Sequence, residues 1–161
     1  MIIESERLKT SILSENDIET LFNIYSDKDA MKFRGSKPMV SINDAVKMVS
    51  ESQSKLNGIL KNRLSIRLKS NNQLIGTLLI KVEEQNKKEV EIGISFGIRY
   101  WNKGYGYETI KMTEKRLKDL KYEKIKAWCK KENRASIKLL EKCDFYKVKQ
   151  NTYPESYLFC K

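Results

Sequence analysis

The feature that most constrains the fold is a change in the spacing of apolar residues along the chain. Between positions 63 and 96, apolar and polar residues alternate in three runs, of which Leu64-Ser65-Ile66 is typical. A period of two is characteristic of β-strands with one buried face. Polar turn clusters at 70–72 and 85–88 separate the runs. The pattern predicts three strands joined as an antiparallel meander.

Helical spacing precedes and follows this meander. A strand at 7–13 comes before a helix that starts at Ser14, and a second helix runs from about Asn43 into the mid-fifties. The second helix is predicted to bury Ile42, Ala45, Val46 and Val49. After Gly104 the order is helix, strand at 125–129, helix, then short strands at 145–148 and 157–160. Such a passage attached to a meander predicts an α+β fold with a mixed sheet.

Length and composition indicate one ordinary domain, residues 1–161. No apolar run approaches membrane-spanning length. The N-terminal residues Met1 to Arg7 lack the basic-then-apolar order of a secretory signal. We therefore expect a cytoplasmic protein without a membrane partner.

The chain has no histidine, which excludes Ser-His-Asp and Cys-His nucleophiles and any histidine-ligated metal. Its three cysteines, Cys129, Cys143 and Cys160, lack the spacing of a zinc site or a disulfide framework. We expect free, buried thiols and no bound metal.

Positive charge is concentrated in the second half of the chain. The formal net charge is +11, and the stretch from Arg99 to Lys149 holds 16 basic and 7 acidic residues. Such a surface attracts phosphorylated cofactors, nucleic acid or ribosomes. Lysine-rich, solvated helix faces explain the same numbers equally well.

Two glycines mark the segment with the clearest chemistry. Gly104 and Gly106 follow a predicted strand and come just before a predicted helix. The first amides of a helix have no partner within it and lie at the positive end of its dipole. Glycine also lets a phosphate approach the backbone closely. Together with Lys103, this bend could bind a pyrophosphate, although glycines alone fit an ordinary turn equally well.

The segment Tyr100 to Glu108 resembles the pyrophosphate loop of GNAT acetyltransferases. Its Trp101, Lys103, Gly104, Tyr105 and Glu108 are similar to the branch that acetylates the N-termini of ribosomal proteins. Three further segments resemble the family in the same order along the chain: Glu4 to Leu8, Glu91-Ile92-Gly93, and Glu132 to Phe145. The resemblance implies a mixed, mostly antiparallel central sheet with helices on both faces.

The resemblance also implies acetyl-CoA as co-substrate and an N-acetyltransferase that acts on a primary amine. Its cofactor-binding residues would lie in a strand, in the glycine bend and after the next strand: Ile94, Ser95, Phe96, Trp101, Asn102, Lys103, Gly104, Tyr105, Gly106, Tyr107 and Asn133. A free strand amide would stabilise the oxyanion of the reacting thioester. Asn133 could serve equally as a helix N-cap.

The catalytic candidates are Glu91 as general base and Ser136 as general acid, both implied by the resemblance. A strand glutamate paired with a lysine, and a helix serine bonded to its own backbone, are the structural alternatives. Many family members carry a tyrosine acid where this chain has Leu140, and Asp144 replaces a glycine. Asp tolerates positive φ, so the second departure should not disturb the fold. We expect direct attack in a ternary complex, not a route through a cysteine.

The acceptor would approach the stretch from Lys28 to Val40, which is rich in lysine and arginine. Polyamines should therefore be poor substrates. The favoured acceptor is a peptide or protein N-terminus, with the ribosome as a candidate partner. A small-molecule amine stays open, as do monomer and homodimer. Two other functions remain: a nucleic-acid-binding module, although nucleic acid is not expected as a substrate, and a GNAT-fold protein that binds CoA without catalysis.

Overall fold

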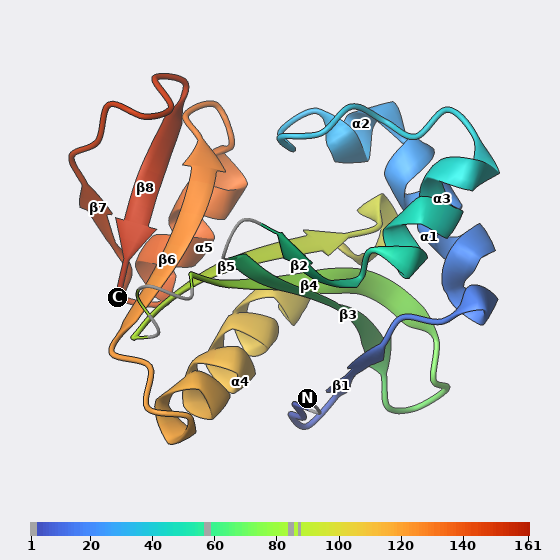
Figure 1. Ribbon diagram of the computed structural model, residues 1–161, viewed down its shortest axis with the longest axis horizontal. Coiled ribbons are helices and arrows are strands. Elements are labelled where there is room, and N and C mark those ends of the chain that lie inside the picture. The colour runs from blue at the N-terminus through green and yellow to red at the C-terminus, as the bar shows by residue number, and fades with distance from the viewer. Residues whose placement is uncertain (1–2, 57–58, 84–85, 87) are drawn as a thin grey trace.

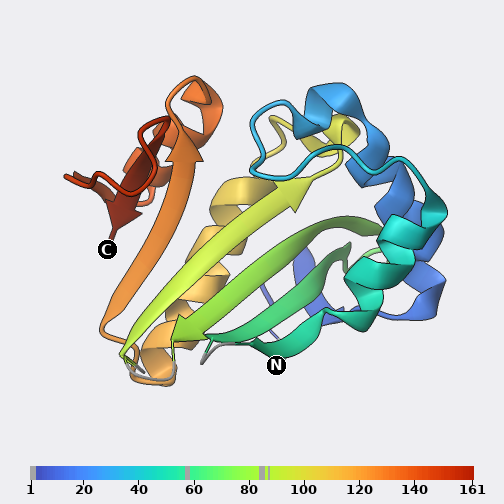
Figure 2. The same ribbon diagram turned by 45° about the horizontal axis from the view of Figure 1, so that its top comes forward.

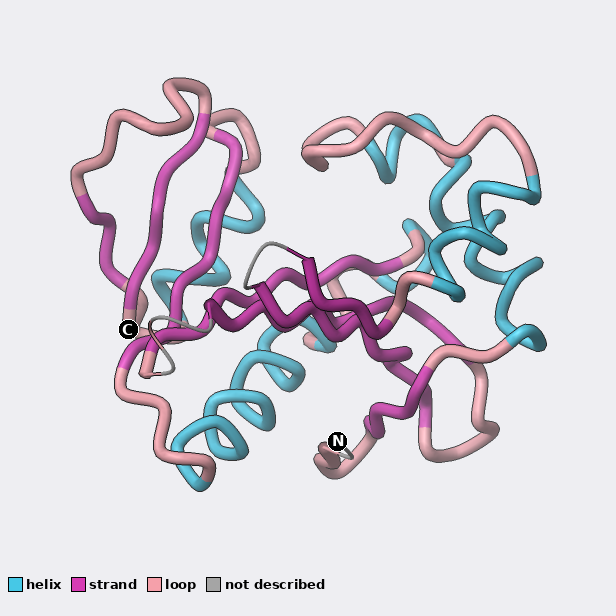
Figure 3. Tube along the Cα trace, viewed as in Figure 1, coloured by secondary structure: helices cyan, strands magenta, loops and turns pink. Residues whose placement is uncertain are grey.

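The computed structural model describes residues 3–56, 59–83, 86 and 88–161, and consists of helices and strands around a central sheet (Figures 1 and 3). The strands are β1 (Leu8–Ile12), β2 (Gln53–Leu56), β3 (Ile59–Leu68), β4 (Leu74–Glu83), β5 (Glu89–Phe96), β6 (Lys124–Lys130), β7 (Tyr146–Val148) and β8 (Ser156–Cys160). The helices are α1 (Ile18–Ser26), α2 (Lys28–Met31), α3 (Ile42–Ser50), α4 (Tyr105–Asp119) and α5 (Arg134–Lys142), with 3-10 turns at Glu15–Asp17 and Ile98–Tyr100.

The strands form one sheet in the order β1-β3-β4-β5-β6-β8-β7, and β2 pairs with β3. Among the strands that the structure describes, β5 and β6 are the one parallel pair and the other pairs are antiparallel. The helices α4 and α5 supply apolar residues to the core on one face of the sheet, and α1 and α3 enclose a second apolar cluster on the other side (Figure 2). The predicted α+β fold, with a mixed, mostly antiparallel sheet and helices on both faces, is confirmed.

The parallel pair β5–β6 is short. It joins Glu89 to Lys124, Val90 to Ile125, and Glu91 to Lys126, after which the two strands separate (Figure 2). β5 continues five residues further, to Phe96, without β6 beside it. The sheet therefore opens in the middle, at the carboxyl ends of two neighbouring strands.

The region before β3 corrects two predictions. α3 ends at Ser50 and not in the mid-fifties, and β2 follows it. Of the four residues predicted to be buried, Ile42 and Val46 are 42% and 44% exposed, so this half of the prediction is wrong. The other two, Ala45 and Val49, pack toward α1 as predicted, together with Met48. These three are also spaced i, i+3, i+4, so periodicity alone could not choose between the two faces.

Two smaller predictions concern Asp144 and the three cysteines. Asp144, at the end of α5, has φ +64°, the left-handed conformation that the replaced glycine would have adopted. Cys129, Cys143 and Cys160 are free and buried, as expected. Among the described helices, none combines the length and apolar character that crossing a membrane requires.

Candidate active site

Where β6 leaves β5, the backbone of β5 has an open edge. Gly97 N–H donates to Ile75 O at 3.0 Å, so the alternation of an antiparallel ladder directs the backbone groups of Ser95 toward β4 as well. The N–H and C=O groups of Ile94 then point the other way, to the side that β6 has left. Of the predicted strand residues, Ile94 and Phe96 lie with backbone groups on this open edge, whereas Ser95 contributes only its side chain, on the face away from α4.

The bend after β5 has the geometry of an anion cradle. Asn102 and Gly104 have φ of +59° and +81°, which turns the chain sharply into α4. The first helical bond joins Glu108 N–H to Gly104 O at 3.1 Å. The amides of residues 105–107 precede that bond and so lack partners within the helix. These amides lie at the positive end of a helix of 15 residues.

Gly106 allows a close approach between elements. A Cβ at this position would lie 2.8 Å from Leu139 Cδ2 of α5 and 3.7 Å from Ile94 Cδ1 of β5. Glycine here lets the first turn of α4 rest directly against the open strand and α5. The bend and the open edge of β5 therefore form one continuous surface.

Arg7, near the N-terminus, stabilises the bend through side-chain contacts, a role that sequence analysis did not predict. Its guanidinium donates to Lys103 O at 3.1 Å and to Glu108 Oε2 at 2.7 Å, and lies 4.7 Å from the centre of the Tyr105 ring. Ser5 Oγ donates to Glu108 Oε1 at 2.6 Å. The two sides of this contact lie in the segments Glu4 to Leu8 and Tyr100 to Glu108, which both resemble the family. The resemblance did not indicate that the two segments are in contact.

The electrostatics of Glu108 reflect this contact. Burial alone raises the pKa of its carboxyl group, but hydrogen bonds from Ser5 and Arg7 outweigh that effect and hold the pKa below its usual range. Glu108 therefore acts as an ionised anchor at the positive end of α4. Trp101 is anchored as well, because its Nε1 donates to Phe96 O at 3.1 Å.

Glu91 lies at the point where β5 and β6 separate. Its carboxylate is 2.7 Å from Lys81 Nζ on β4, and its side chain is 29% exposed. This is the lysine pairing that sequence analysis left open as an alternative. Glu91 precedes Ile94 by three residues, or about 10 Å along a strand. A base at this distance would act through water.

Asn133 and Ser136 lie at the N-terminal end of α5. Asn133 Oδ1 accepts from Ser136 N–H at 3.1 Å, so Asn133 is the N-cap of α5. Burial raises the pKa of the Cys129 thiol, and a hydrogen bond with Ser136 partly offsets this, which places Ser136 beside Cys129 on β6. Leu140 is buried in the core. A leucine side chain cannot donate a proton, so this position supplies no general acid.

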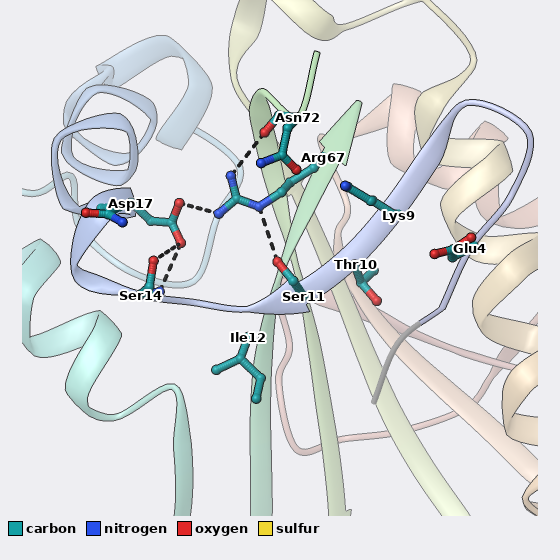
Figure 4. Close-up of a pocket in the computed structure, with 10 residues that line it drawn as sticks. Glu4, Lys9, Thr10, Ser11, Ile12, Ser14, Asp17, Arg67 and Asn72 are labelled. Carbon is teal, nitrogen blue, oxygen red and sulfur yellow. Dashed lines mark hydrogen bonds and ion pairs between the residues drawn. The ribbon is translucent and has the colours of Figure 1, made fainter. Parts of the chain in front are cut away.

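A hollow beside β1 lies elsewhere and is internally satisfied (Figure 4). Arg67 forms an ion pair with Asp17 and donates to Ser11 Oγ and to Asn72 O, both at 3.2 Å. Asp17 also accepts from Ser14 N–H at 2.9 Å. Because these charges neutralise one another, the network serves to hold β1 and α1 to the β3–β4 turn.

Comparison with known proteins agrees with this geometry. A family profile described as "Acetyltransferase (GNAT) domain" matches residues 7–146. An uncharacterized N-acetyltransferase, p20 of Bacillus licheniformis, is 30% identical over 145 residues, covering 89% of this chain and 81% of its own. The chain belongs to the GNAT acetyltransferase family. It is an acyl-CoA-dependent N-acetyltransferase.

Solved structures show the same fold. A GNAT-family acetyltransferase from Bacillus anthracis superposes with a TM-score of 0.85 at 25% identity, covering 100% of this chain and 98% of that one. A Vibrio cholerae protein, named provisionally as a ribosomal-protein-serine acetyltransferase, has a TM-score of 0.80 at 15% identity, with 100% and 97% covered. At that identity the second likeness concerns the fold alone.

Proposed function

We propose that this enzyme transfers the acetyl group of acetyl-CoA to a primary amine by direct attack in a ternary complex. The observation that carries the proposal is the continuous surface formed by the open edge of β5 and the bend before α4. The neutral amine nitrogen attacks the thioester carbonyl carbon, the C–S bond breaks, and the products are an amide and CoA. The amine loses one proton and the departing thiolate gains one.

In this proposal the diphosphate of CoA lies against the amides of the glycine bend, with Lys103 adding positive charge. The pantetheine arm follows β5, where the backbone of Ile94 takes the place of the missing ladder partner. Its N–H would hold the thioester oxygen as negative charge develops there. Trp101, Asn102, Tyr105, Gly106 and Tyr107 line the bend, and Asn133 is the contact proposed beyond β6.

The residues proposed for proton transfer are those that the family resemblance implies. Glu91 is the proposed base, acting through water because of its distance from Ile94. Ser136 is the proposed acid, and solvent can protonate the thiolate without it. A cysteine route is disfavoured, since burial raises the pKa of the thiols of Cys129, Cys143 and Cys160.

For the acceptor, we propose a peptide or protein N-terminus, with the ribosome as one possible partner, or a small amine. The basic stretch from Arg99 to Lys149 supports docking near a polyanion. We also propose that residues 1–161 work as one acetyltransferase domain, because β7 and β8, which extend beyond the family match, complete the sheet beside β6.

Thermal unfolding with and without acetyl-CoA tests the assignment of the bend. A ligand that binds only the folded state must raise the melting temperature. We expect the rise in the wild type and its loss in Gly104→Asp, where a carboxylate would repel phosphate. Gly104→Ala has the same unfavourable φ without the charge and should keep more of the rise.

Gly35→Asp is the matched control, because a Cβ at this exposed glycine would meet nothing within 4 Å. It should respond to acetyl-CoA as the wild type does. No response in the wild type, or an equal response in Gly104→Asp, would contradict the assignment.

A further inference from the structure

Two arginines and a tyrosine gather on the face of the sheet opposite α4. Tyr25 of α1 is buried, and its Oη lies 2.6 Å from Thr77 Oγ1 of β4. Arg63 Nη1 of β3 donates to both oxygens, at 3.1 and 3.2 Å. The Arg34 guanidinium, from the segment after α2, stacks 4.5 Å from the centre of the Tyr25 ring. We call Arg34, Arg63 and Tyr25 the arginine–tyrosine cluster.

The cluster adjoins the strand segment assigned to the thioester. Thr77 lies directly opposite Ser95 in the β4–β5 register, one residue from Ile94. Arg34 Nη2 donates to Phe96 O at 3.1 Å. An acceptor held by the cluster would therefore lie beside the open edge of β5, where the amine has to arrive.

Within the described ranges, no carboxylate forms an ion pair with either arginine of the cluster, although both are partly buried. Arg34 Nη1 is shielded from solvent and has no hydrogen-bond partner among the described residues. Asp27 is near enough to act on Arg34 electrostatically, but its Oδ1 accepts from the amides of Asp29 and Ala30 at 2.9 and 3.0 Å.

The pKa of Tyr25 responds to the positive charge of the two arginines. Burial by itself raises the pKa of Tyr25, but the charges of Arg63 and Arg34 and hydrogen bonds with Thr77 and Ser95 lower it below the usual value. Negative charge is thus favoured at this position. Partly buried guanidiniums that lack a counter-ion are costly to a fold, and a carboxylate or phosphate is the partner whose geometry suits them.

We propose that the acceptor amine carries an anionic group, a carboxylate or a phosphate, which binds Arg34 and Arg63 and so directs the amine toward Ile94. This inference rests on the proposed acetyl transfer for its purpose, but the binding of the anion can be measured without catalysis. It separates acidic amines, including acidic peptide N-termini, from neutral amines and polyamines.

The test compares pairs of compounds that differ only in the anion: glycine with glycinamide, the dipeptide amides Ser-Glu with Ser-Gln, and phosphoethanolamine with ethanolamine. Binding is measured by calorimetry and thermal shift on the full chain, with and without saturating CoA. We expect the anionic member of at least one pair to bind the wild type about tenfold more tightly, the scale of one charge-assisted contact. Which pair responds distinguishes a carboxylate from a phosphate.

The variants decide whether the cluster is responsible. Arg34→Gln and Arg63→Gln should bring both members of the pair to equal affinity, whereas Arg34→Lys should keep part of the preference. Lys37→Gln, at an exposed lysine of the same segment, is the matched control and should keep all of it. Circular dichroism of each variant checks that it is folded.

Equal affinities within every pair in the wild type would overturn the inference, as would a preference that survives in both arginine variants. The second result would mean that anions bind only to the general positive surface. Failure of CoA to bind would count against the proposed acetyl transfer alone, because the anion preference is read in its absence too.

Discussion

A few side chains hold the glycine bend in place, and Glu108 makes the largest number of these contacts. It binds Ser5 and Arg7 and lies in the first turn of α4, at the positive end of that helix. The contact spans about a hundred residues of sequence, which explains why no local pattern could announce it. The bend itself was predicted from its glycines, because positive φ at Gly104 is a local property.

Replacing Glu108 should affect both stability and coenzyme binding. Glu108→Gln removes a charge-assisted pair, and we expect a loss of about 1–2 kcal/mol in the free energy of unfolding. The KM for acetyl-CoA should rise several-fold as the bend loosens. Urea unfolding and steady-state kinetics measure the two effects, with the exposed Glu6→Gln as control.

The pH dependence of that loss has a defined sign. The pKa of Glu108 is lower in the folded protein than in the unfolded chain. Its stabilising effect is therefore complete above the unfolded pKa of glutamate and disappears as the pH falls through the folded value. The stability difference between wild type and Glu108→Gln should shrink in acid. A difference that grows as pH falls would contradict the role of the ionised form.

Glu91 and Lys81 offer a test of the proposed base. If Glu91 accepts the proton, Glu91→Gln should lower kcat about a hundredfold, within the usual range for general-base catalysis. Lys81→Gln removes the ion pair but leaves the carboxylate, and should cost far less. Equal losses of kcat in the two variants would show that the pair matters only for structure.

At the level of elements, the sequence predicted those parts whose pattern is local. The meander of β3, β4 and β5 and the helix α4 follow from apolar spacing and turn residues. β2 was missed because its four residues, Gln53–Leu56, carry no alternating apolar pattern, although their backbone pairs with β3. Half of the predicted buried face of α3 was wrong, because only packing on α1 decides between two overlapping helical stripes. The arginine–tyrosine cluster was missed because the topology alone brings α1, β3 and the segment after α2 together.

The C-terminal residue is tied to α4 through a buried carboxylate. Glu114, which is 6% exposed, lies 2.9 Å from both Lys118 Nζ and Lys161 Nζ. We expect Glu114→Gln to lower the free energy of unfolding by about 1–3 kcal/mol, because Lys161 then loses the less exposed of its two carboxylate partners. Acetyl-CoA binding should be unchanged. Asp119→Asn, at the exposed end of the same helix, is the control and should change stability by less than about 0.5 kcal/mol.

For the whole molecule, the net charge of +11 should govern which ligands approach. Spermidine carries only positive charge and should be acetylated poorly at low salt. The KM for acetyl-CoA should rise with added salt, because screening weakens the attraction of the protein for phosphate. Kinetics across a salt series measure both. Rapid spermidine turnover, or a KM for acetyl-CoA that does not respond to salt, would show that overall charge has little influence.

The early separation of β6 from β5 has a consequence for the life of the protein without its ligand. An unpaired strand edge in the middle of a sheet invites other polypeptides to add to it. Acetyl-CoA, lying along Ile94 and Phe96, would occupy that edge in every productive cycle. At low acetyl-CoA concentration the enzyme should therefore be prone to aggregate as well as inactive. Its solubility should rise with the concentration of acetyl-CoA.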